Sequence, residues 1–457
     1  MRTFRASCPY LFVPAISALL GCGARTPLDG AACRPIEALE DPGSCEGDWT
    51  ETPPHVLTTE APGAVLAAGC DSVYVVAGGS VHRSSDGGAT FGAPVELPED
   101  VGGPYVGSSR WQSAAATKGG FLYLAGRRDG ALVVYHGDGS TWSERGTLAA
   151  STPWLASANI LARREDDVAL WWLEGPAPLG FFAARSTDGG RNFGVPLAVT
   201  DDTMTTHTYG SVCLAGANAI AAAFFSCNSL DCTGDDSGVS LRAGFGALSV
   251  DNGPFQRTEI FRREDDWAGF PPAPVVGCHE SGAVVVAWPT GPSGAFAAAA
   301  EPCAPLTLRG GSNWEQGTSC CEPYDMDIAV SETRALVKWV EGSGGGSGFL
   351  VMNLAGELAG PPLDVGDLDS DGVTDIVADA CALPGDRFAA ITRRDKYSVP
   401  GKGGQSLALW IDRTGAITEM RPLGPSDSQL ISPHVACDRR GRAHFVWSDQ
   451  GTWIASL

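Results

Sequence analysis

Four closely spaced aspartates make the segment GDLDSDGVTDIV the clearest metal-binding pattern in the chain. Gly372 stands at position 6, where such a loop needs a sharp turn, and oxygen ligands recur at the alternate positions that wrap around Ca²⁺. The residues at positions 1, 3, 5, 7 and 9 are Asp367, Asp369, Asp371, Val373 and Asp375. Position 12 holds Ala378 in place of a bidentate glutamate, so the pattern predicts a weak, structural calcium site, with an empty acidic turn as the alternative.

Other patterns of catalysis and cofactor binding are missing from the sequence. The chain has no glycine-rich phosphate loop, no nucleophile elbow and no HExxH zinc motif. Its cysteines do not recur as CxxC pairs with histidines at zinc-finger spacing, so zinc is not expected. The sequence therefore does not define a substrate, and attention turns to the elements that position its polar and aromatic residues.

Short apolar runs bounded by Gly, Asp and Pro follow one another along the chain. They predict strands, because no long stretch shows the helical period of 3.6 residues. Several runs end in tryptophan, namely VALWW at 168–172, AVVVAW at 283–288, ALVKW at 335–339 and AHFVW at 443–447. The run before often ends in a cysteine, at Cys70, Cys213, Cys278, Cys381 and Cys437. The recurrence of a rare residue at one phase indicates a repeated structural unit.

The repeated units predict an all-β fold, a β-propeller of four-stranded blades. The last unit offers about three strands before the chain stops, and HVLTT at 55–59 is the candidate for its fourth, which closes a ring. Eight blades are counted, with seven as the alternative because the phase of the long fourth unit is ambiguous. The units are expected to start near Ala64, Trp111, Trp154, Tyr209, Pro272, Tyr324, Asp375 and Pro433.

Large aromatic residues stand just before the first run of several units. They are Trp111, Trp154, Tyr209 and Tyr324, with Arg110 beside the first and His434 in the last unit. If the units are blades, these side chains ring one mouth of the central channel. Flat aromatic faces around a shallow concavity suit sugar rings or flexible peptides, with plain packing between blades as the alternative.

The chain spells RSSDGGATF at 83–91 and RSTDGGRNF at 185–193. Both match the Ser-x-Asp-x-Gly-x-x-aromatic pattern of the Asp-box, and on this pattern the chain resembles the sialidase-like, or BNR-repeat, superfamily of propellers. A shorter third copy, HGDGSTW, follows at 136–142. A folded turn explains these residue types, and the resemblance implies a structural hairpin between third and fourth strands, far from the active face. The matching residues are Ser84, Asp86, Gly88, Phe91, Ser186, Asp188, Gly190 and Phe193.

The resemblance also implies what catalysis would require. Sialidases of this superfamily use three arginines, a tyrosine nucleophile assisted by a glutamate, and an aspartate acid/base. The Phe-Arg-Ile-Pro signature that supplies the first arginine is absent from this chain. Tyr397, near Arg393 and Arg394, is a candidate nucleophile, but an exposed glycine-rich loop explains that segment equally well. The aspartate loop at 366–377 in turn resembles the calcium loops of FG-GAP and VCBS propellers.

Composition and charge limit the partners. The 457 residues are 44% hydrophobic and 18% charged, with 59 Gly and 31 Pro, which favours a chain of strands and turns. The formal net charge of −22 repels phosphate backbones and anionic headgroups. We therefore expect no nucleic-acid partner, and contact with a membrane only through a lipid anchor.

The first residues predict export. Arg2 and Arg5 precede an apolar stretch at 10–20 that is too short to span a bilayer, which is typical of a signal peptide. The stretch ends in Leu-Leu-Gly-Cys, which resembles a bacterial lipobox and implies cleavage before Cys22 and lipidation of its thiol. Gly23 follows in place of Asp, which in such signals favours sorting to the outer membrane, with ordinary secretion as the alternative.

The expected divisions are a signal peptide over 1–21, a Gly- and Pro-rich tether over 22–54 and the propeller over 55–457. Setting aside Cys8 and Cys22 from the 14 cysteines leaves 12, an even number that predicts disulfides in an exported chain. Cys33 and Cys45 are candidates for a small loop in the tether, and Cys227 and Cys232 for a staple at a hairpin end. The vicinal Cys320 and Cys321 have no partner that the sequence assigns.

Together these features predict a surface-displayed, non-catalytic β-propeller lipoprotein of the outer membrane that faces the periplasm or the cell surface. Its expected partner is a glycan or an extracellular protein bound at the channel mouth, with Ca²⁺ as a structural ion and a monomer as the expected state. An exo-acting glycoside hydrolase of sialidase type is the alternative, and it is supported by fold resemblance alone.

Overall fold

The computed structural model describes part of the chain, and every regular element in that part is a strand. Arg34–Leu457 forms one compact unit. Among the described residues, no helix is long and apolar enough to cross a membrane. The described residues are 34–38, 45, 49–60, 62–101, 113–152, 155, 157–175, 180–200, 210–227, 240–265, 274–291, 294–300, 303–304, 306, 308–315, 323–341, 347–366, 368, 375–394, 406–423, 431–449 and 451–457.

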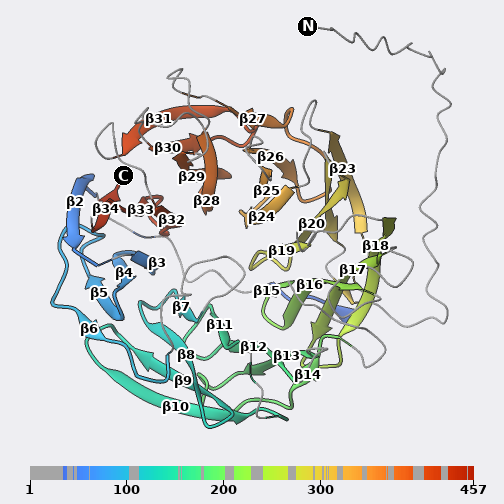
Figure 1. The fold of residues 1–457 in the computed structure, drawn as a ribbon, viewed down its shortest axis with the longest axis horizontal. Coiled ribbons are helices and arrows are strands. Elements are labelled where there is room, and N and C mark those ends of the chain that lie inside the picture. Colours follow the sequence, from blue (N-terminus) through green and yellow to red (C-terminus); the bar gives the residue numbers. More distant parts are fainter. Residues whose placement is uncertain are drawn as a thin grey trace, which may run out of the picture. The chain divides into compact units, whose positions relative to one another are not determined.

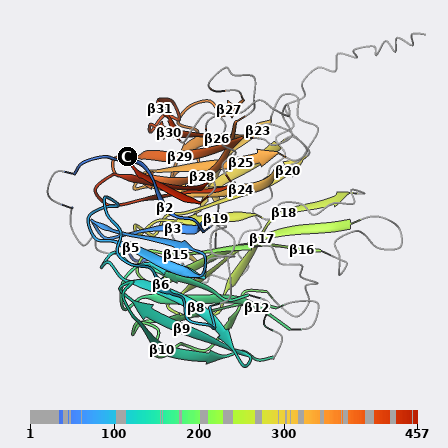
Figure 2. The same cartoon turned by 60° about the vertical axis from the view of Figure 1, so that its left-hand side comes forward.

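Eight four-stranded sheets stand as blades around a central channel, so the fold is an eight-bladed β-propeller (Figures 1 and 2). The count of eight is thereby confirmed over the alternative of seven. Blades 1 to 4 consist, from the channel outward, of β3 (Pro62–Ala68), β4 (Ser72–Ala77), β5 (Ser80–Ser84) and β6 (Val95–Glu96); β7 (Ala114–Ala116), β8 (Leu122–Arg128), β9 (Ala131–Gly137) and β10 (Trp142–Ala149); β11 (Asn159–Ala162), β12 (Val168–Glu174), β13 (Gly180–Ser186) and β14 (Leu197–Ala198); β15 (Gly210–Ala215), β16 (Ala219–Cys227), β17 (Ser240–Val250) and β18 (Gln256–Asp265).

Blades 5 to 8 repeat the arrangement, except that an early strand completes the last blade. In the same order they consist of β19 (Val275–Cys278), β20 (Val284–Gly291), β21 (Gly294–Ala300) and β23 (Leu308–Glu315); β24 (Pro323–Val330), β25 (Arg334–Glu341), β26 (Ser347–Asn353) and β27 (Leu363–Val365); β28 (Asp375–Leu383), β29 (Arg387–Arg394), β30 (Ser406–Ile411) and β31 (Ile417–Leu423); β32 (Ile431–Cys437), β33 (Ala443–Ser448), β34 (Thr452–Ser456) and β2 (Thr52–Thr58). A separate two-stranded sheet pairs β1 (Arg34–Pro35) with β22 (Cys303–Ala304).

The ring closes where β2, from the N-terminal part of the chain, meets the C-terminal strands. β2 pairs antiparallel with β34, so that His55 lies opposite Ile454 and Val56 opposite Trp453. Figure 1 shows β2 in blue beside the red strands of the last blade. The three C-terminal strands therefore receive their outer partner from the other end of the sequence, and no blade edge is left open at the junction.

The hydrophobic core lies between the blades rather than at one centre. Each of eight clusters of buried side chains joins two neighbouring blades, around the whole ring. The tryptophans that end the apolar runs belong to second strands, and Trp172, Trp339 and Trp447 are fully buried in these layers. Alternate residues of one strand thus face the preceding and the following blade, which is why second strands are largely apolar.

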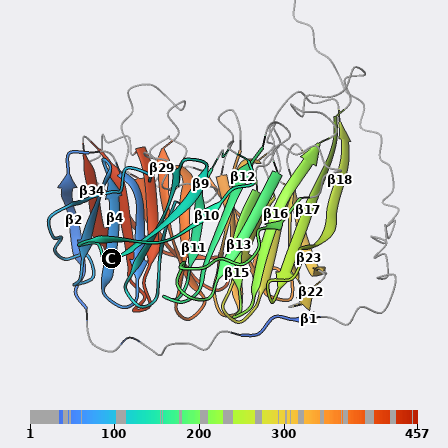
Figure 3. The ribbon, with the colours of Figure 1, turned by 90° about the horizontal axis from the view of Figure 1, so that it is seen from below.

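The two faces of the ring differ. We call the face on which first strands end the turn face. The opposite face, on which first strands begin, is the loop face. Figure 3 shows that β16, β17 and β18 reach beyond their neighbours on one side of the ring. Tight turns between first and second strands define the turn face, at 69–71, 117–121, 163–167, 216–218, 279–283, 331–333, 384–386 and 438–442.

Hydrogen bonds join successive turns around the turn face. The Tyr74 hydroxyl donates to the Gly120 carbonyl at 2.5 Å, and the Tyr123 hydroxyl donates to the Glu165 carbonyl at 2.7 Å. Arg185 reaches the Ala217 carbonyl of the following blade in the same manner. Each blade thereby fixes the first turn of the next one, so the position of a blade depends on both neighbours.

Three disulfides between described cysteines stiffen this arrangement. Cys213–Cys278 joins the first strands of blades 4 and 5, and Cys381–Cys437 joins those of blades 7 and 8. The expected pair of Cys33 and Cys45 is wrong, because Cys45 is bonded to Cys70 of blade 1. The cysteines at one phase of the repeat therefore pair between blades 4 and 5 and between blades 7 and 8, whereas Cys70 of blade 1 pairs with Cys45 outside the blades. The side chain of Cys227, and Cys232, Cys320 and Cys321, lie outside the described residues.

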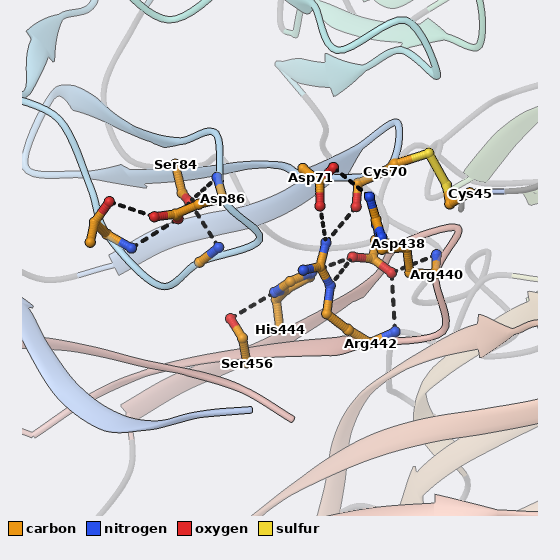
Figure 4. Close-up of polar contacts among 12 residues, drawn as sticks. Cys45, Cys70, Asp71, Ser84, Asp86, Asp438, Arg440, Arg442, His444 and Ser456 are labelled. Carbon is orange, nitrogen blue, oxygen red and sulfur yellow. Dashed lines mark hydrogen bonds and ion pairs between the residues drawn. A yellow bond between two sulfur atoms is a disulfide. The ribbon is translucent and has the colours of Figure 1, made fainter. Parts of the chain in front are cut away.

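The two nonapeptides form the same turn between third and fourth strands of blades 1 and 3. Ser84 Oγ accepts the Gly88 N–H at 2.8 Å, and Asp86 Oδ1 accepts the Thr90 N–H at 2.9 Å (Figure 4). Phe91 packs against the apolar cluster that joins blades 8 and 1. In the second copy, Gly190 N–H donates to Ser186 Oγ at 2.8 Å, Asn192 N–H donates to Asp188 Oδ1 at 2.9 Å, and Phe193 packs between blades 2 and 3.

A buried polar network fills the seam between blades 8 and 1, directly under the first of these turns (Figure 4). Asp438 Oδ2 accepts Arg442 Nε at 2.5 Å and lies 3.2 Å from His444 Nε2, while His444 Nδ1 lies 2.9 Å from Ser456 Oγ. Arg442 also donates to the Cys70 carbonyl and, at 3.1 Å, to Asp71 of blade 1. Burial lowers the pKa of His444, although Asp438 opposes this, so the imidazole is neutral and the buried charges balance.

We predict that Gly88→Ala destabilises the ring more than Gly79→Ala. Both glycines have positive φ, 88° and 79°, so each alanine carries the same backbone cost of about 1 kcal/mol. A Cβ at Gly79 meets open space, whereas a Cβ at Gly88 overlaps Ser456 Oγ. The expected loss for Gly88→Ala is at least about 3 kcal/mol in urea unfolding. Equal losses in the two variants would show that the turn does not rest on the network beneath it.

Candidate functional site

Two cavities follow one another along the central channel. The first, of about 450 Å³, is lined by the middle of the first strands, from Ala64 in blade 1 to Ala436 in blade 8. The second, of about 520 Å³, shares part of this wall and extends to the turns, including Lys118, His279 and Arg439. A cavity of this size holds a small ligand or one side chain of a larger one.

Three ionisable side chains line the first cavity, among residues that are otherwise small or apolar. They are Asp327 on β24, Asp379 on β28 and His434 on β32. Because these are the first strands of blades 6, 7 and 8, the three groups converge on one side of the channel wall. We call Asp325, Asp327, Lys338, Asp379 and His434 the channel cluster.

Lys338 is the positive centre of the channel cluster. It lies directly opposite Asp327 in the pairing of β24 with β25, and its Nζ lies 3.2 Å from Asp325 Oδ2. Only 2% of Lys338 is exposed. A buried ammonium needs partners, and here the carboxylates on the neighbouring first strand supply them.

Asp379 links blade 7 to blade 8. It follows a β-bulge in β28, where the register shifts between Val377 and Asp379, and its Oδ2 accepts the Val435 N–H at 3.0 Å. His434 Nδ1 lies 3.5 Å from the same oxygen. The bulge turns this side chain toward the channel, as bulges next to binding sites commonly do.

Burial and neighbouring charges shift the ionisation of the cluster. Burial raises the pKa of Asp327 to about 6, and Asp379 adds to this effect while Lys338 opposes it. Burial alone would lower the pKa of Lys338, but Asp325, Asp327 and Asp379 together outweigh burial and hold it above its ordinary value. A carboxyl that titrates near neutral pH beside a second carboxylate can bind hydroxyl or cationic groups, or exchange a proton with a ligand.

An ion pair lies in the second cavity. Lys118 Nζ of blade 2 and Glu280 Oε2 of blade 5 form an ion pair across the channel, near the turn face. Arg163 is occupied as well, since it pairs with Asp167 at 2.6 Å. The described polar groups of this second cavity are thus largely paired with one another, which leaves the first cavity as the better candidate for ligand binding.

Most residues that the sequence nominated for binding fall outside the described part of the chain. These are Arg110, Trp111, Trp154 and Tyr209. Tyr324 lies in β24, but its side chain is not described. Tyr397 lies entirely outside the described residues. Arg393 and Arg394 end β29, and His434 is the one aromatic residue of the nominated mouth with a described position, on the cavity wall.

The proposed calcium loop is described at its end only. Asp367, Asp369, Asp371 and Val373 lie outside the described residues, and so does the lipidation candidate Cys22. Asp375 begins β28 fully buried, where its carboxylate accepts the Leu368 N–H at 3.1 Å and the Thr392 hydroxyl at 3.2 Å. Among the described residues, no group of three or more His, Cys, Asp or Glu side chains is placed to hold a metal ion.

Sequence reasoning missed the channel cluster, although signals for it exist. YDMDIAV puts two aspartates at alternate positions of a first strand, and ALVKW puts a lysine inside an otherwise apolar second strand. A charge in the interior of a predicted buried strand needs a partner of opposite charge. The two aspartates and the lysine are therefore each other's expected partners.

Comparison with known proteins supports the fold. No protein-family model and no curated protein matches the chain. The propeller of Dos1 is 12% identical with a TM-score of 0.52, over 89% of this chain and 94% of that one. The WD40 domain of SCAP from fission yeast is 9% identical with a TM-score of 0.50, over 89% and 97%. A polysaccharide lyase of family PL25, an ulvan lyase, is 11% identical with a TM-score of 0.41, over 82% and 96%, which carries no argument about chemistry.

We predict that Lys338→Met destabilises the protein by about 3 kcal/mol, because it leaves buried carboxylates without their cation. The same change raises the pKa of Asp327 above about 6, since Lys338 lowers that pKa. Urea unfolding and carboxyl NMR titration measure the two effects. Lys118→Met is the matched control, with an expected cost below about 1 kcal/mol because its ion pair is partly exposed. Equal costs in both variants would contradict the prediction.

Proposed function

We propose that the protein is a non-catalytic β-propeller that binds a glycan or protein ligand at the loop-face mouth of its channel. The observation that carries this proposal is the 450 Å³ cavity, into which Asp327, Asp379 and His434 converge from three blades. The three side chains are held by main-chain and cross-strand contacts, so a ligand finds its polar partners already oriented.

The lining of this cavity supports binding over sialidase chemistry. Among the described residues that line it, there is no arginine to hold a carboxylate and no tyrosine to act as nucleophile. We propose that the chain nonetheless belongs with the sialidase-like propellers, on the strength of its two Ser-x-Asp-x-Gly-x-x-Phe turns. Export as an outer-membrane lipoprotein through Cys22 remains part of this proposal and rests on the sequence of the first residues.

Glycoside hydrolysis is the second candidate, and one observation favours it. Asp327 titrates near pH 6 beside Asp379, which is the kind of asymmetry that separates an acid from a base in carboxylate pairs. Lys338, however, sits within the same cluster and pairs with Asp325 at 3.2 Å, which suits a fixed binding surface.

We predict that ligand binding weakens as the pH falls from 7.5 to 5, because Asp327 loses its charge at about pH 6. Asp327→Asn should weaken binding by about tenfold at pH 7.5 and remove the pH dependence, as expected for one charge-assisted hydrogen bond. A glycan array and titration calorimetry measure this, with Glu357→Gln, on the turn after β26, as the control. Turnover of fluorogenic glycosides, sialosides included, that disappears in Asp327→Asn would establish the hydrolase in place of the binding protein.

We also propose a structural Ca²⁺ held by the aspartate loop before β28. Asp375 fits this role in part, since its buried carboxylate lies at the end of the aspartate loop and accepts the Leu368 N–H of that loop at 3.1 Å. EDTA should lower the melting temperature by several degrees and Ca²⁺ restore it, as expected for an ion that binds only the folded state. Asp371→Asn should abolish the shift and Asp364→Asn, on β27, should not. A melting temperature indifferent to both reagents would leave an empty acidic turn.

A further inference from the structure

A β-bulge in blade 2 aims one arginine at a buried histidine. The register of β10 against β9 shifts between Glu144 and Gly146, which makes Arg145 the extra residue. Its Nη2 donates to His136 Nδ1 at 2.9 Å. Because the bulge breaks the alternation of the strand, the side chain of Arg145 lies on the same face as His136.

Two donors at this place have no acceptor. His136 is 7% exposed, and its Nδ1 accepts from Arg145, so the neutral ring carries its proton on Nε2. His136 Nε2 and Arg145 Nε are both buried and have no hydrogen-bond partner among the described residues. Buried donors are normally satisfied, and a pair of orphans on two bonded residues calls for an acceptor from outside the chain.

A turn of blade 3 brings a second arginine, Arg191, to this seam. Arg191 belongs to the Asp188 turn, where its Nη1 donates to the Asp188 carbonyl at 2.8 Å. The main chain of Gly190 and Arg191 lies against the bulge at Gly146. Burial, together with the charges of Arg145 and Arg191, lowers the pKa of His136 to about 4, while Asp138 opposes them. The imidazole is therefore neutral beside two positive charges.

The seam between blades 8 and 1 has a similar arrangement in which carboxylates balance the charge of the arginine. There a nonapeptide turn also covers a histidine and an arginine, but Arg442 pairs with Asp438 and Asp71. At the seam between blades 2 and 3, neither the Arg145 nor the Arg191 guanidinium has a carboxylate as a hydrogen-bond partner among the described residues; only the main-chain N–H of Arg191 donates to one, Asp188 Oδ1 at 3.1 Å. The two seams have a similar arrangement. Among the described residues, a carboxylate accepts from the arginine side chain only at the seam between blades 8 and 1.

We propose that Arg145, His136 and Arg191 form a binding site for a single oxyanion, a carboxylate or sulfate group. Its oxygens would accept from His136 Nε2–H and from both guanidiniums, which are the side chains best suited to planar or tetrahedral oxyanions. The acidic protein, with a net charge of −22, disfavours long polyanions, so the ligand is a small acid or one acidic sugar at a chain end. None of the three residues lines either channel cavity, and the site does not rest on the proposed function.

Sulfate alone is the first probe. Titration of sulfate into the uniformly ¹⁵N-labelled protein, against chloride at equal ionic strength, should move the His136 Nε2 resonance with saturation in the millimolar range. Arg145→Gln should weaken the binding by about tenfold, as expected when one charge-assisted contact is removed. Arg128→Gln is the matched control in the same blade, because Arg128 already pairs with Asp100 and Glu144, and it should leave the sulfate affinity unchanged.

Arg191→Gln keeps the test decisive if Arg145→Gln fails to fold. Arg191 is exposed, and among the described residues its side chain donates only to the Asp188 carbonyl, so its replacement should preserve the melting temperature and weaken sulfate binding several-fold. A His136 resonance that does not respond to sulfate, or responds equally in wild type and Arg191→Gln, overturns the proposal. In that case the two orphan donors are satisfied by ordered water.

Discussion

Closure of the ring is the constraint on which the rest of the structure depends. β2 completes the last blade by pairing with β34, and the seam beside it holds a buried carboxylate, Asp438, between Arg442 and His444. A buried carboxylate is tolerated only with partners that neutralise it. The contacts of Arg442 with Cys70 and Asp71 therefore tie the final blade to the first, and a central channel exists only because this tie is made.

The channel owes its chemistry to the position of the first strands. Side chains there alternate between the two neighbouring blades, so a charge on a first strand is shared by two seams. Asp379 shows this directly, since it receives the Val435 N–H of blade 8 while it raises the pKa of Asp327 in blade 6. Lys338 makes such a concentration of carboxylates stable. The ionisation of this wall and the stability of the fold are consequently coupled.

Much of the fold follows from the sequence, whereas little of the site does. Runs such as AHFVW, bounded by turn residues, predict the second strands, and recurrent cysteines mark the first strands, because burial and turn chemistry are local properties. The partner of Cys45 was not predictable, since it depends on where the chain before β2 passes blade 1. The channel cluster was missed for the same reason: Asp327 and Asp379 stand 52 residues apart by their numbers and meet only when the ring is built.

The closing strand also sets the order of events during folding. A chain that emerges from its N-terminus delivers β2 first and β34 last, so the pairing of these strands spans nearly the whole sequence and must follow the other blades. Contacts of such separation are slow to form. The Cys45–Cys70 disulfide holds β2 beside blade 1 meanwhile, which shortens the search that the last blade must make. Formation of this disulfide before the last blade folds thus favours the final step of assembly, in addition to stabilising the closed ring.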